Sequence, residues 1–163
     1  TNPLQGGKAY RVFAPTGDEA VSLICYNLNT SPRHRKVQAT ISRSDYLLRE
    51  TMTGKPIPQN KRIILYDWNE QTASELDTDQ QTELEGFTDR LYHLCPVNNG
   101  WAVIGVQEKF LSPATVRIIS CNRKQLTLDV LCSGTVRVWV ESGNKKELRS
   151  IPVTTPGTIT INK

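Results

Sequence analysis

The sequence lacks the features that most directly assign a function. No apolar run approaches the roughly 20 residues that a membrane-spanning helix needs, and no segment has the pattern of a signal peptide. The four cysteines include no CxxC pair, so there is no zinc signature. Their even number is compatible with disulfides, although a chain of 163 residues does not need them to fold. We therefore predict no metal, no cofactor and no membrane partner, and no cellular compartment follows from these features.

A nucleic-acid partner is not indicated either. The net charge of +4 is mild, and the basic residues neither follow a helix nor accompany an aromatic ribonucleoprotein-type motif. The charge is instead segregated along the chain. Basic residues crowd the stretch from Arg33 to Arg62, and acidic residues fill the stretch from Glu70 to Asp89, where no Lys or Arg occurs. In a sheet protein we expect two solvated faces with some cross-strand pairing, and the alternative is a docking surface.

Helical periodicity is also absent, and only Ser44 to Glu50 could form a turn of helix. Short strand-like segments recur between turn-forming residues, which predicts a single domain over residues 1–163, an all-β antiparallel sandwich of two sheets with roughly ten strands and little or no helix. The segments are Lys8 to Ala14, Ala20 to Leu28, Val37 to Ser42, Arg62 to Trp68, Leu91 to Cys95, Trp101 to Val106, Thr115 to Cys121, Leu126 to Cys132, Val136 to Glu141 and Thr158 to Ile161. The polar stretch Glu70 to Glu85 is predicted to be a loop or a pair of exposed edge strands.

Two hairpins are predicted in more detail. Asn98-Asn99-Gly100 is a turn that needs positive φ, and apolar runs flank it on both sides, so we expect a central hairpin of Leu91 to Val97 and Trp101 to Val106. The run from Trp101 is apolar on both faces, which is typical of a buried strand. Nearer the end of the chain, apolar residues alternate with polar ones on both sides of Ser133-Gly134. This second hairpin is predicted to have one core face, with Trp139 on the wetter face.

Residues with catalytic potential are isolated in the sequence. His34 lies in a basic turn and is predicted to be exposed, whereas His93 lies in a strand and is predicted to be packed or hydrogen-bonded. Asp77 and Asp79 are close in sequence, but glycoside hydrolysis needs carboxyl groups about 5 to 9.5 Å apart across a pocket, and nothing apolar surrounds these two. They also lack the remaining oxygen ligands of a calcium loop. We predict no catalytic residue.

Two tryptophans are candidates for carbohydrate binding. Trp68 ends the strong strand that begins at Ile63, and an exposed ring there could stack on a sugar. The alternative is a Trp that caps the end of the core. Trp139 is the second candidate because of its outward position in the alternation, whereas Trp101 lies within an apolar run.

Lys109 and Phe110 are candidates for an interdomain contact. They directly follow the predicted central strand and the dipeptide Gln107-Glu108. Lys109 could pair near Glu108 or with Asp67 inside the domain, or it could reach across a seam to another domain. Both alternatives are compatible with the sequence.

An ordered series of motifs resembles a known family. Cys95-Pro96-Val97 is followed by Gly100-Trp101-Ala102-Val103-Ile104-Gly105, then by Glu108-Lys109-Phe110 and Ser112-Pro113-Ala114. Tyr26-Asn27-Leu28-Asn29, Ala39-Thr40-Ile41 with Ser44-Asp45-Tyr46, and Leu65-Tyr66-Asp67-Trp68 agree in order. With these motifs most of the chain resembles the C-terminal β-sandwich of the raffinose synthase and seed imbibition protein family, which are α-galactosidase-like glycoside hydrolases. The family often has Asp where Glu108 stands.

The resemblance implies that the chemistry lies elsewhere. In that family the catalytic Asp residues belong to an upstream (β/α)8 barrel, which needs about 250 residues, and no residue here matches their motifs. The sequence begins Thr1-Asn2-Pro3 without an initiator Met, so we expect a piece of a longer protein. Our first hypothesis is a non-catalytic accessory domain whose partner is the catalytic barrel of the same polypeptide. The second is a carbohydrate-binding module that uses exposed Trp or Tyr, and the third and least favoured is an autonomous enzyme.

Overall fold

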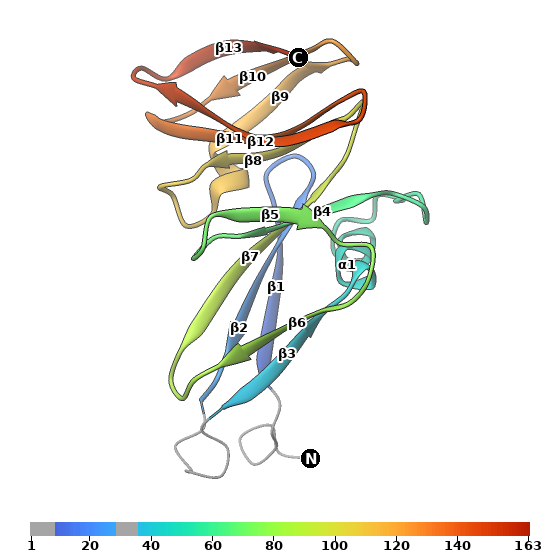
Figure 1. Ribbon diagram of the computed structural model, residues 1–163, viewed down its shortest axis with the longest axis vertical. Helices are drawn as coiled ribbons and strands as arrows, with labels where there is room; N and C mark the ends of the chain where they lie inside the picture. Colours follow the sequence, from blue (N-terminus) through green and yellow to red (C-terminus); the bar gives the residue numbers. More distant parts are fainter. Residues whose placement is uncertain (1–8, 29–35) are drawn as a thin grey trace.

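The computed structural model describes residues 9–28 and 36–163, which form mainly antiparallel β-structure (Figure 1). Within these ranges there are thirteen strands, one α-helix and a 3-10 turn. They are β1 (Tyr10–Thr16), β2 (Ala20–Tyr26), β3 (Val37–Ile41), α1 (Arg43–Thr53), β4 (Ile63–Asp67), β5 (Thr72–Glu75), β6 (Gln80–Leu84), β7 (Asp89–Pro96), β8 (Trp101–Val106), η2 (Ser112–Thr115), β9 (Val116–Cys121), β10 (Gln125–Val130), β11 (Gly134–Ser142), β12 (Lys145–Val153) and β13 (Gly157–Asn162). The prediction of mainly antiparallel β-structure is confirmed, and the thirteen strands form four sheets that pack together, where the sequence predicts roughly ten strands in two sheets.

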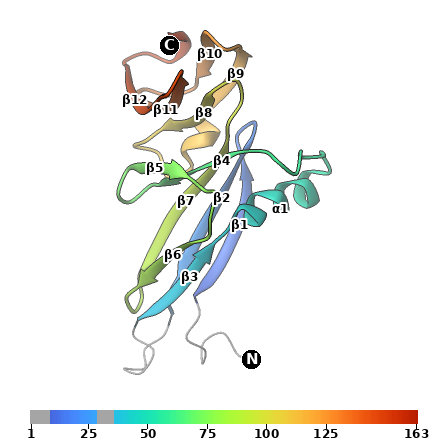
Figure 2. The same ribbon diagram turned by 45° about the vertical axis from the view of Figure 1, so that its right-hand side comes forward.

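The first half of the chain forms a five-stranded sheet in the order β1-β2-β7-β4-β5. One face of this sheet packs against the two-stranded β3–β6 sheet and against α1, as Figure 2 shows. Leu23, Leu94 and Ile63 from the large sheet meet Ile41 and Leu84 from the small one in the first hydrophobic core. The predicted edge strands between Glu70 and Glu85 are therefore real, but β5 pairs with β4 and β6 pairs with β3.

Helix α1 is longer than the single turn that the sequence predicts. It begins with a capping box between Ser42 and Asp45 and ends at Gly54, whose φ is 73°. Both devices satisfy backbone groups that a helix end leaves free. Only Asp45 and Tyr46 of the helix are buried, so there is no broad apolar stripe. The helix was underestimated because its caps and polar contacts, rather than an apolar periodicity, hold it in place.

The last third of the chain forms a smaller sandwich, which we call the upper sandwich. Its two sheets have the orders β12-β11-β8 and β13-β10-β9, and it lies across one end of the five-stranded sheet (Figures 1 and 2). The predicted core positions Leu126, Leu128 and Val130 of β10 and Val136, Val138 and Val140 of β11 are buried between these sheets. This part of the prediction is confirmed.

Both predicted hairpins are wrong in their pairing. Asn98 and Trp101 do exchange backbone hydrogen bonds of 2.8 and 2.9 Å around Asn99 and Gly100, which have positive φ. However, β7, which precedes this turn, pairs with β2 and β4, whereas β8, which follows it, pairs with β11. Likewise β10 and β11 belong to opposite sheets of the upper sandwich. The apolar faces were predicted correctly, but they meet across a core instead of lying side by side.

A third hydrophobic core joins the upper sandwich to the five-stranded sheet. Ile64, Tyr66 and Cys95 from the large sheet pack against Ile104 of β8 and Trp139 of β11. Trp139 is only 9% exposed, so its predicted position on a wet face is wrong. The alternation correctly places the Trp139 ring on the face of β11 that does not carry the core valines. This face is buried as well, because the five-stranded sheet packs against it. All four cysteines are free, and Cys25 and Cys95 are buried.

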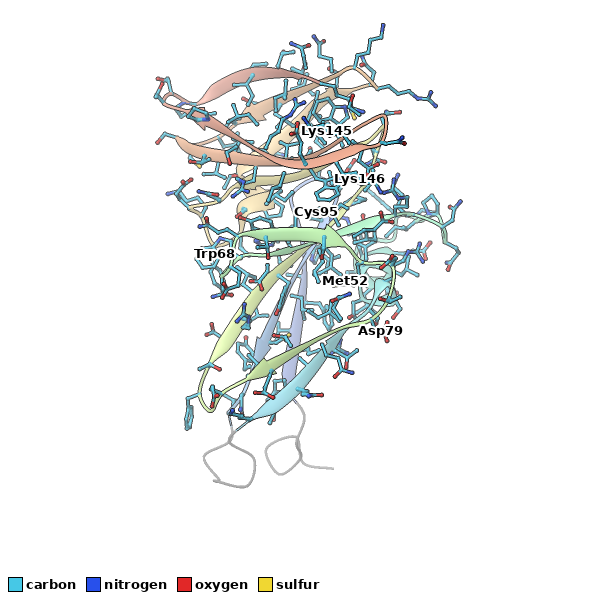
Figure 3. The ribbon with its side chains drawn as sticks, in the orientation of Figure 1. Met52, Trp68, Asp79, Cys95, Lys145 and Lys146 are labelled. Carbon is cyan, nitrogen blue, oxygen red and sulfur yellow. The ribbon has the colours of Figure 1, made fainter. Side chains whose placement is uncertain are left out.

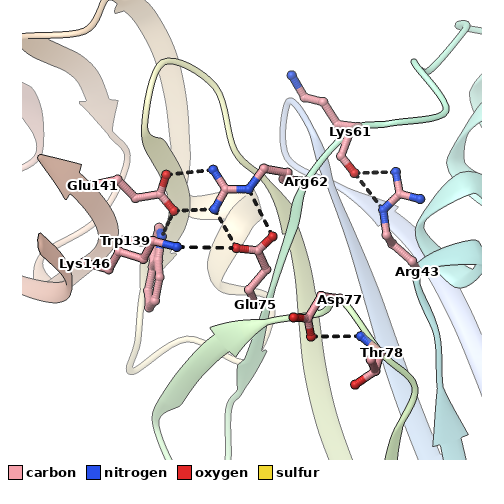
Figure 4. Close-up of polar contacts among 9 residues, drawn as sticks. All are labelled: Arg43, Lys61, Arg62, Glu75, Asp77, Thr78, Trp139, Glu141 and Lys146. Carbon is pink, nitrogen blue, oxygen red and sulfur yellow. Dashed lines mark hydrogen bonds and ion pairs between the residues drawn. The ribbon is translucent and has the colours of Figure 1, made fainter. Parts of the chain in front are cut away.

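The segregated charges pair across strands, as the sequence predicts. Lys36 lies near Glu83 and Glu85 at 3.7 and 3.5 Å. Arg62 lies between Glu75 of β5 and Glu141 of β11, with nitrogen to oxygen distances of 2.5 and 2.7 Å (Figure 4). The Glu141 carboxylate also accepts a hydrogen bond of 3.0 Å from the Trp139 indole, which fixes it beside the third core. Arg62 thereby links the five-stranded sheet to the upper sandwich.

We expect this link to make stability depend on pH below about 4.5. The hydrogen bonds from Arg62 lower the pKa of Glu141 from 4.5 to about 2, so its contribution is complete above pH 4.5 and is lost as the pH falls through 2. Because Arg62 is partly exposed, we expect a loss of about 2 kcal/mol. Urea unfolding between pH 2.5 and 5 should show a shallower pH dependence for Glu141→Gln than for the unsubstituted chain.

The matched control is Glu85→Gln, which removes a carboxylate from the exposed pair with Lys36. It should follow the pH dependence of the unsubstituted chain. Equal slopes for Glu141→Gln and Glu85→Gln would contradict the assigned role of Glu141.

Candidate functional site

The structure brings together residues that two separate sequence arguments single out. Trp68 follows β4, and its indole N–H is shared between the carbonyl oxygens of Gln107 and Lys109, at 2.9 and 3.0 Å. The ring of Phe110 meets the Trp68 ring edge-on, with centroids 5.5 Å apart. Figure 3 shows Trp68 at the edge of the molecule, where the five-stranded sheet meets the upper sandwich. We call Trp68, Lys109, Phe110 and Leu111 the Trp68–Leu111 surface.

The loop that carries this surface is folded tightly onto β8. The Ser112 hydroxyl is buried and donates to the Lys109 carbonyl at 2.7 Å. The Thr115 hydroxyl donates to the Ser112 carbonyl and accepts from the Val106 N–H, at 2.7 and 2.9 Å. Gly105 has a φ of 106°, and a Cβ on it would lie 1.9 Å from the Ser112 carbonyl oxygen. Only glycine permits this close approach of two backbone segments.

His93 of β7 binds the same loop from the face of the five-stranded sheet. Its Nε2 lies 3.1 Å from the Phe110 carbonyl oxygen, which can only accept, so Nε2 carries the proton. Nδ1 must then accept from the Ser22 hydroxyl at 2.8 Å, and Ser22 accepts in turn from Thr16 at 2.7 Å. The ring also stacks nearly parallel to Tyr66, with centroids 6.3 Å apart. The predicted packed and hydrogen-bonded role of His93 is confirmed.

Burial controls the protonation of His93. The side chain is fully enclosed, and desolvation lowers its pKa from 6.5 to about 4. At neutral pH the ring is therefore uncharged and can accept from Ser22 while it donates to Phe110. Protonation at Nδ1 would oppose that arrangement, since it would face the hydroxyl with a second donor. His93 thus holds the Phe110 loop against the sheet through its two hydrogen bonds.

The Trp68–Leu111 surface is mainly apolar. Phe110 is 48% exposed and Leu111 is 41% exposed, whereas Trp68 is half-buried against the third core. The burial of Trp68 matches the alternative in which it caps the end of the core. Such a pair of adjacent exposed apolar side chains on a rigid loop is suited to contact another apolar surface.

The side chain of Lys109 has none of its predicted intradomain partners. The carboxylate of Asp67 is bound by Arg90 at 2.8 Å, and Glu108 accepts from the backbone N–H of Thr135 at 2.7 Å. Lys109 is exposed, and no ion pair joins it to any residue in the ranges that the structure describes. The ammonium group is therefore free to face a partner beside Phe110.

The remaining sequence candidates do not form a site. Asp77 and Asp79 lie in the exposed loop between β5 and β6, where Asp77 bonds the N–H of Thr78 (Figure 4). The buried ring of Trp139 offers no free face to a sugar. His34 lies outside the described residues. Among residues 9–28 and 36–163, no group of three His, Cys, Asp or Glu side chains could hold a metal ion, and no helix is long and apolar enough to cross a membrane.

Sequence reasoning missed Leu111 and the connection between His93 and Phe110. A signal for Leu111 is present, because two adjacent apolar residues stand between Lys109 and the turn-forming Ser112-Pro113, outside any strand. No local sequence pattern predicts the contact of His93 with Phe110. The two residues are 17 positions apart, and between them the chain passes from the five-stranded sheet to the upper sandwich.

The comparisons with known proteins add no family to this picture. No protein-family model matches the chain, and no curated protein matches it. What the structure establishes is a mostly-β chain of antiparallel sheets.

The first test of this site concerns His93 and pH. Because the pKa of His93 is lower in the folded chain than in the unfolded one, the unfolded state binds more protons between pH 6.5 and 4. Stability should therefore fall by about 3 kcal/mol as the pH drops through this window, and the effect should level off below about pH 4. His93→Gln keeps an amide donor for the Phe110 carbonyl but cannot titrate, so urea unfolding of this variant should lack the slope.

His34→Gln is the matched control, because the chain contains two histidines and the sequence predicts that His34 is exposed. This control should retain the slope between pH 6.5 and 4. A slope that survives in His93→Gln and disappears in His34→Gln would show that the wrong histidine has been assigned.

The second test concerns the close approach at Gly105. Gly105→Ala should destabilise the chain by about 3 kcal/mol or more, because it combines an unfavourable φ with a clash against the Ser112 carbonyl. Gly143→Ala is the control, since Gly143 also has a positive φ of 61° but has nothing within 4 Å of an added Cβ. We expect it to cost about 1 kcal/mol. Equal losses in thermal and urea unfolding would refute the packing argument for Gly105.

Proposed function

We propose that this chain is a non-catalytic accessory β domain that packs on and stabilises a glycoside-hydrolase-type barrel supplied by the rest of its parent protein. The proposal places the chemistry in the barrel and assigns no catalytic residue to this chain. The Trp68–Leu111 surface is the contact that we assign to the barrel.

The observation that carries the proposal is an apolar row that continues from this surface and becomes exposed at its far end. On the face of the five-stranded sheet that holds His93, Val12 lies opposite Ile24, and Ile24 lies opposite Leu91. The backbone N–H of Trp68 bonds the Leu91 carbonyl, so the row ends at Trp68. Val12 is 48% exposed, and Ile24 is only partly buried. Leu91, at the Trp68 end of the row, is buried, whereas Val12 and Ile24 lie outside the third core and form the exposed end of the row. This exposed end adds apolar surface beside Phe110 for a partner to cover.

The sequence resemblance supports a barrel as the occupant. Two of the motifs that carry it, Leu65-Tyr66-Asp67-Trp68 and Glu108-Lys109-Phe110, lie far apart in sequence but form this surface together. Interdomain contacts within one chain are moderately apolar and include some charge, which fits exposed Phe110 and Leu111 beside Lys109.

A carbohydrate-binding module is the second candidate, and one observation about Trp68 bears on it. The indole N–H, which is the polar atom of this side chain, is already shared between two backbone carbonyls. The ring is also half-buried, so it offers a small platform to a sugar. These contacts favour a structural role for Trp68, and we therefore rank the accessory domain first.

The proposal predicts that Phe110 matters more in the parent protein than in the isolated chain. We expect Phe110→Asp to lower the melting temperature of the full reading frame by several degrees more than that of the isolated chain, where the ring is half-exposed and loses only its edge-on contact with Trp68. Hydrogen exchange should also show that the amides of residues 107–112 and 11–13 become better protected in the parent protein.

Phe87→Asp is the matched control. Phe87 is 68% exposed in the turn between β6 and β7, and its positive φ of 57° is one that Asp tolerates. This variant should leave both melting temperatures unchanged. The proposal fails if the reading frame encodes no barrel, or if the amides of residues 107–112 exchange equally in the two proteins.

A further inference from the structure

A second feature of the molecule is a preformed pocket far from the Trp68–Leu111 surface. It lies beside α1, on the right of Figure 1, whereas the connection from β8 to β9 lies on the left. The pocket has a volume of about 190 Å³, and its walls come from the turn between β1 and β2, the end of α1, the segment 55–61 and the turn after β7. Its lining includes Glu19, Tyr46, Ile57, Pro58, Lys61 and Asn98.

Helix α1 holds two walls of this pocket in place. Arg49 donates to the carbonyl oxygens of Asp18 and Ala20, at 2.9 and 2.5 Å, which fixes the turn between β1 and β2. Arg43 donates to the carbonyls of Gln59 and Lys61, as Figure 4 shows for Lys61. Glu50 accepts from the Ile57 N–H at 3.2 Å. The cavity therefore does not depend on a loose loop, and a ligand would not have to order its walls.

The polar groups of the pocket converge on one amide. Asn98 donates through Nδ2 to Glu19 at 2.8 Å, and its Oδ1 accepts from the Lys61 ammonium. The hydroxyl of Tyr46 donates to the Glu19 backbone carbonyl at 2.6 Å and so can still accept a hydrogen bond. Burial raises the pKa of Glu19, although Lys61 opposes this effect. The described residues supply one hydrogen bond to the Glu19 carboxylate, at Oε2, and leave Oε1 available for a donor.

The charges and apolar groups of the pocket indicate which ligand would fit. Lys55, Lys61 and Arg49 disfavour a cation, while Asp18 and Glu19 disfavour an anion. Ile57 and three proline rings, Pro56, Pro58 and Pro96, supply apolar walls for a face of C–H groups. These charges favour a ligand without net charge that presents both donors and acceptors and has an apolar face.

We propose that this pocket binds a neutral polyhydroxylated ring compound through a pair of neighbouring hydroxyl groups. One hydroxyl donates to Glu19 Oε1, and its neighbour accepts from the Lys61 ammonium, whose other N–H groups are not used by Asn98. The C–H face of the ring lies against the prolines and Ile57. This inference does not depend on the proposed accessory function, because it uses a different face of the chain.

The test is an amide chemical-shift titration of the 163-residue chain with D-galactose, D-glucose and myo-inositol as probes. We expect saturable shifts, with millimolar affinity for at least one probe, at the amides of residues 18–20 and of Lys55, Ile57 and Asn98. Glu19→Gln and Lys61→Met should each weaken binding about tenfold, because each removes a charge-assisted hydrogen bond. The spectrum of each variant without ligand shows whether the pocket remains folded.

Glu83→Gln and Lys124→Met are matched controls at exposed positions outside the pocket, and both should bind like the unsubstituted chain. The proposal is overturned if none of the three probes shifts these amides, or if the pocket variants bind as well as the controls. It is also overturned if glycine or alanine saturates the pocket and the polyols do not, because the ligand would then be a zwitterion. Shifts confined to Trp68 and residues 107–111 would place a sugar site at the Trp68–Leu111 surface instead.

Discussion

Strand β8 is buried on both of its faces, and the rest of the structure depends on this. Trp101 and Val106 enter the core of the upper sandwich, while Ala102 and Ile104 enter the core that meets the five-stranded sheet. Burial of a large aliphatic side chain is worth roughly 2 to 3 kcal/mol, so one short strand contributes to two cores at once. Its two layers of contact determine that the upper sandwich lies across the end of the large sheet (Figure 1).

The candidate surface follows from this arrangement. Strands β8 and β9 belong to the two different sheets of the upper sandwich, and the loop between them lies against the face of the five-stranded sheet that holds His93. Gly105 lets the loop approach its own strand, and His93 binds it from the sheet below. Phe110 and Leu111 are therefore held outward by a rigid base, next to the row that ends at Val12. Because these apolar side chains are held rigidly, less conformational entropy is lost when a partner contacts them.

Local sequence patterns are sufficient to predict much of this fold. The alternation in β10 and β11 identified their buried residues correctly, and the Asn98-Asn99-Gly100 turn has the positive φ that its residues require. Pairing was predicted wrongly in both hairpins, because a turn specifies the direction of the next few residues but not which strand will complete the sheet. The error at Trp139 has the same origin, since its face is wet or dry only according to what packs against it.

The sequence by itself therefore determined the positions of the strands and turns and the segregation of charge along the chain. It also identified Trp68 and Phe110 as candidate contact residues. Only the tertiary structure decided that these two aromatic rings touch, that Trp139 is enclosed, and that His93 holds a loop 17 residues away. The reason is physical. Alternation and turn propensity act over a few neighbouring residues, whereas burial and hydrogen-bond partners are set by surfaces that meet only when separate sheets pack together.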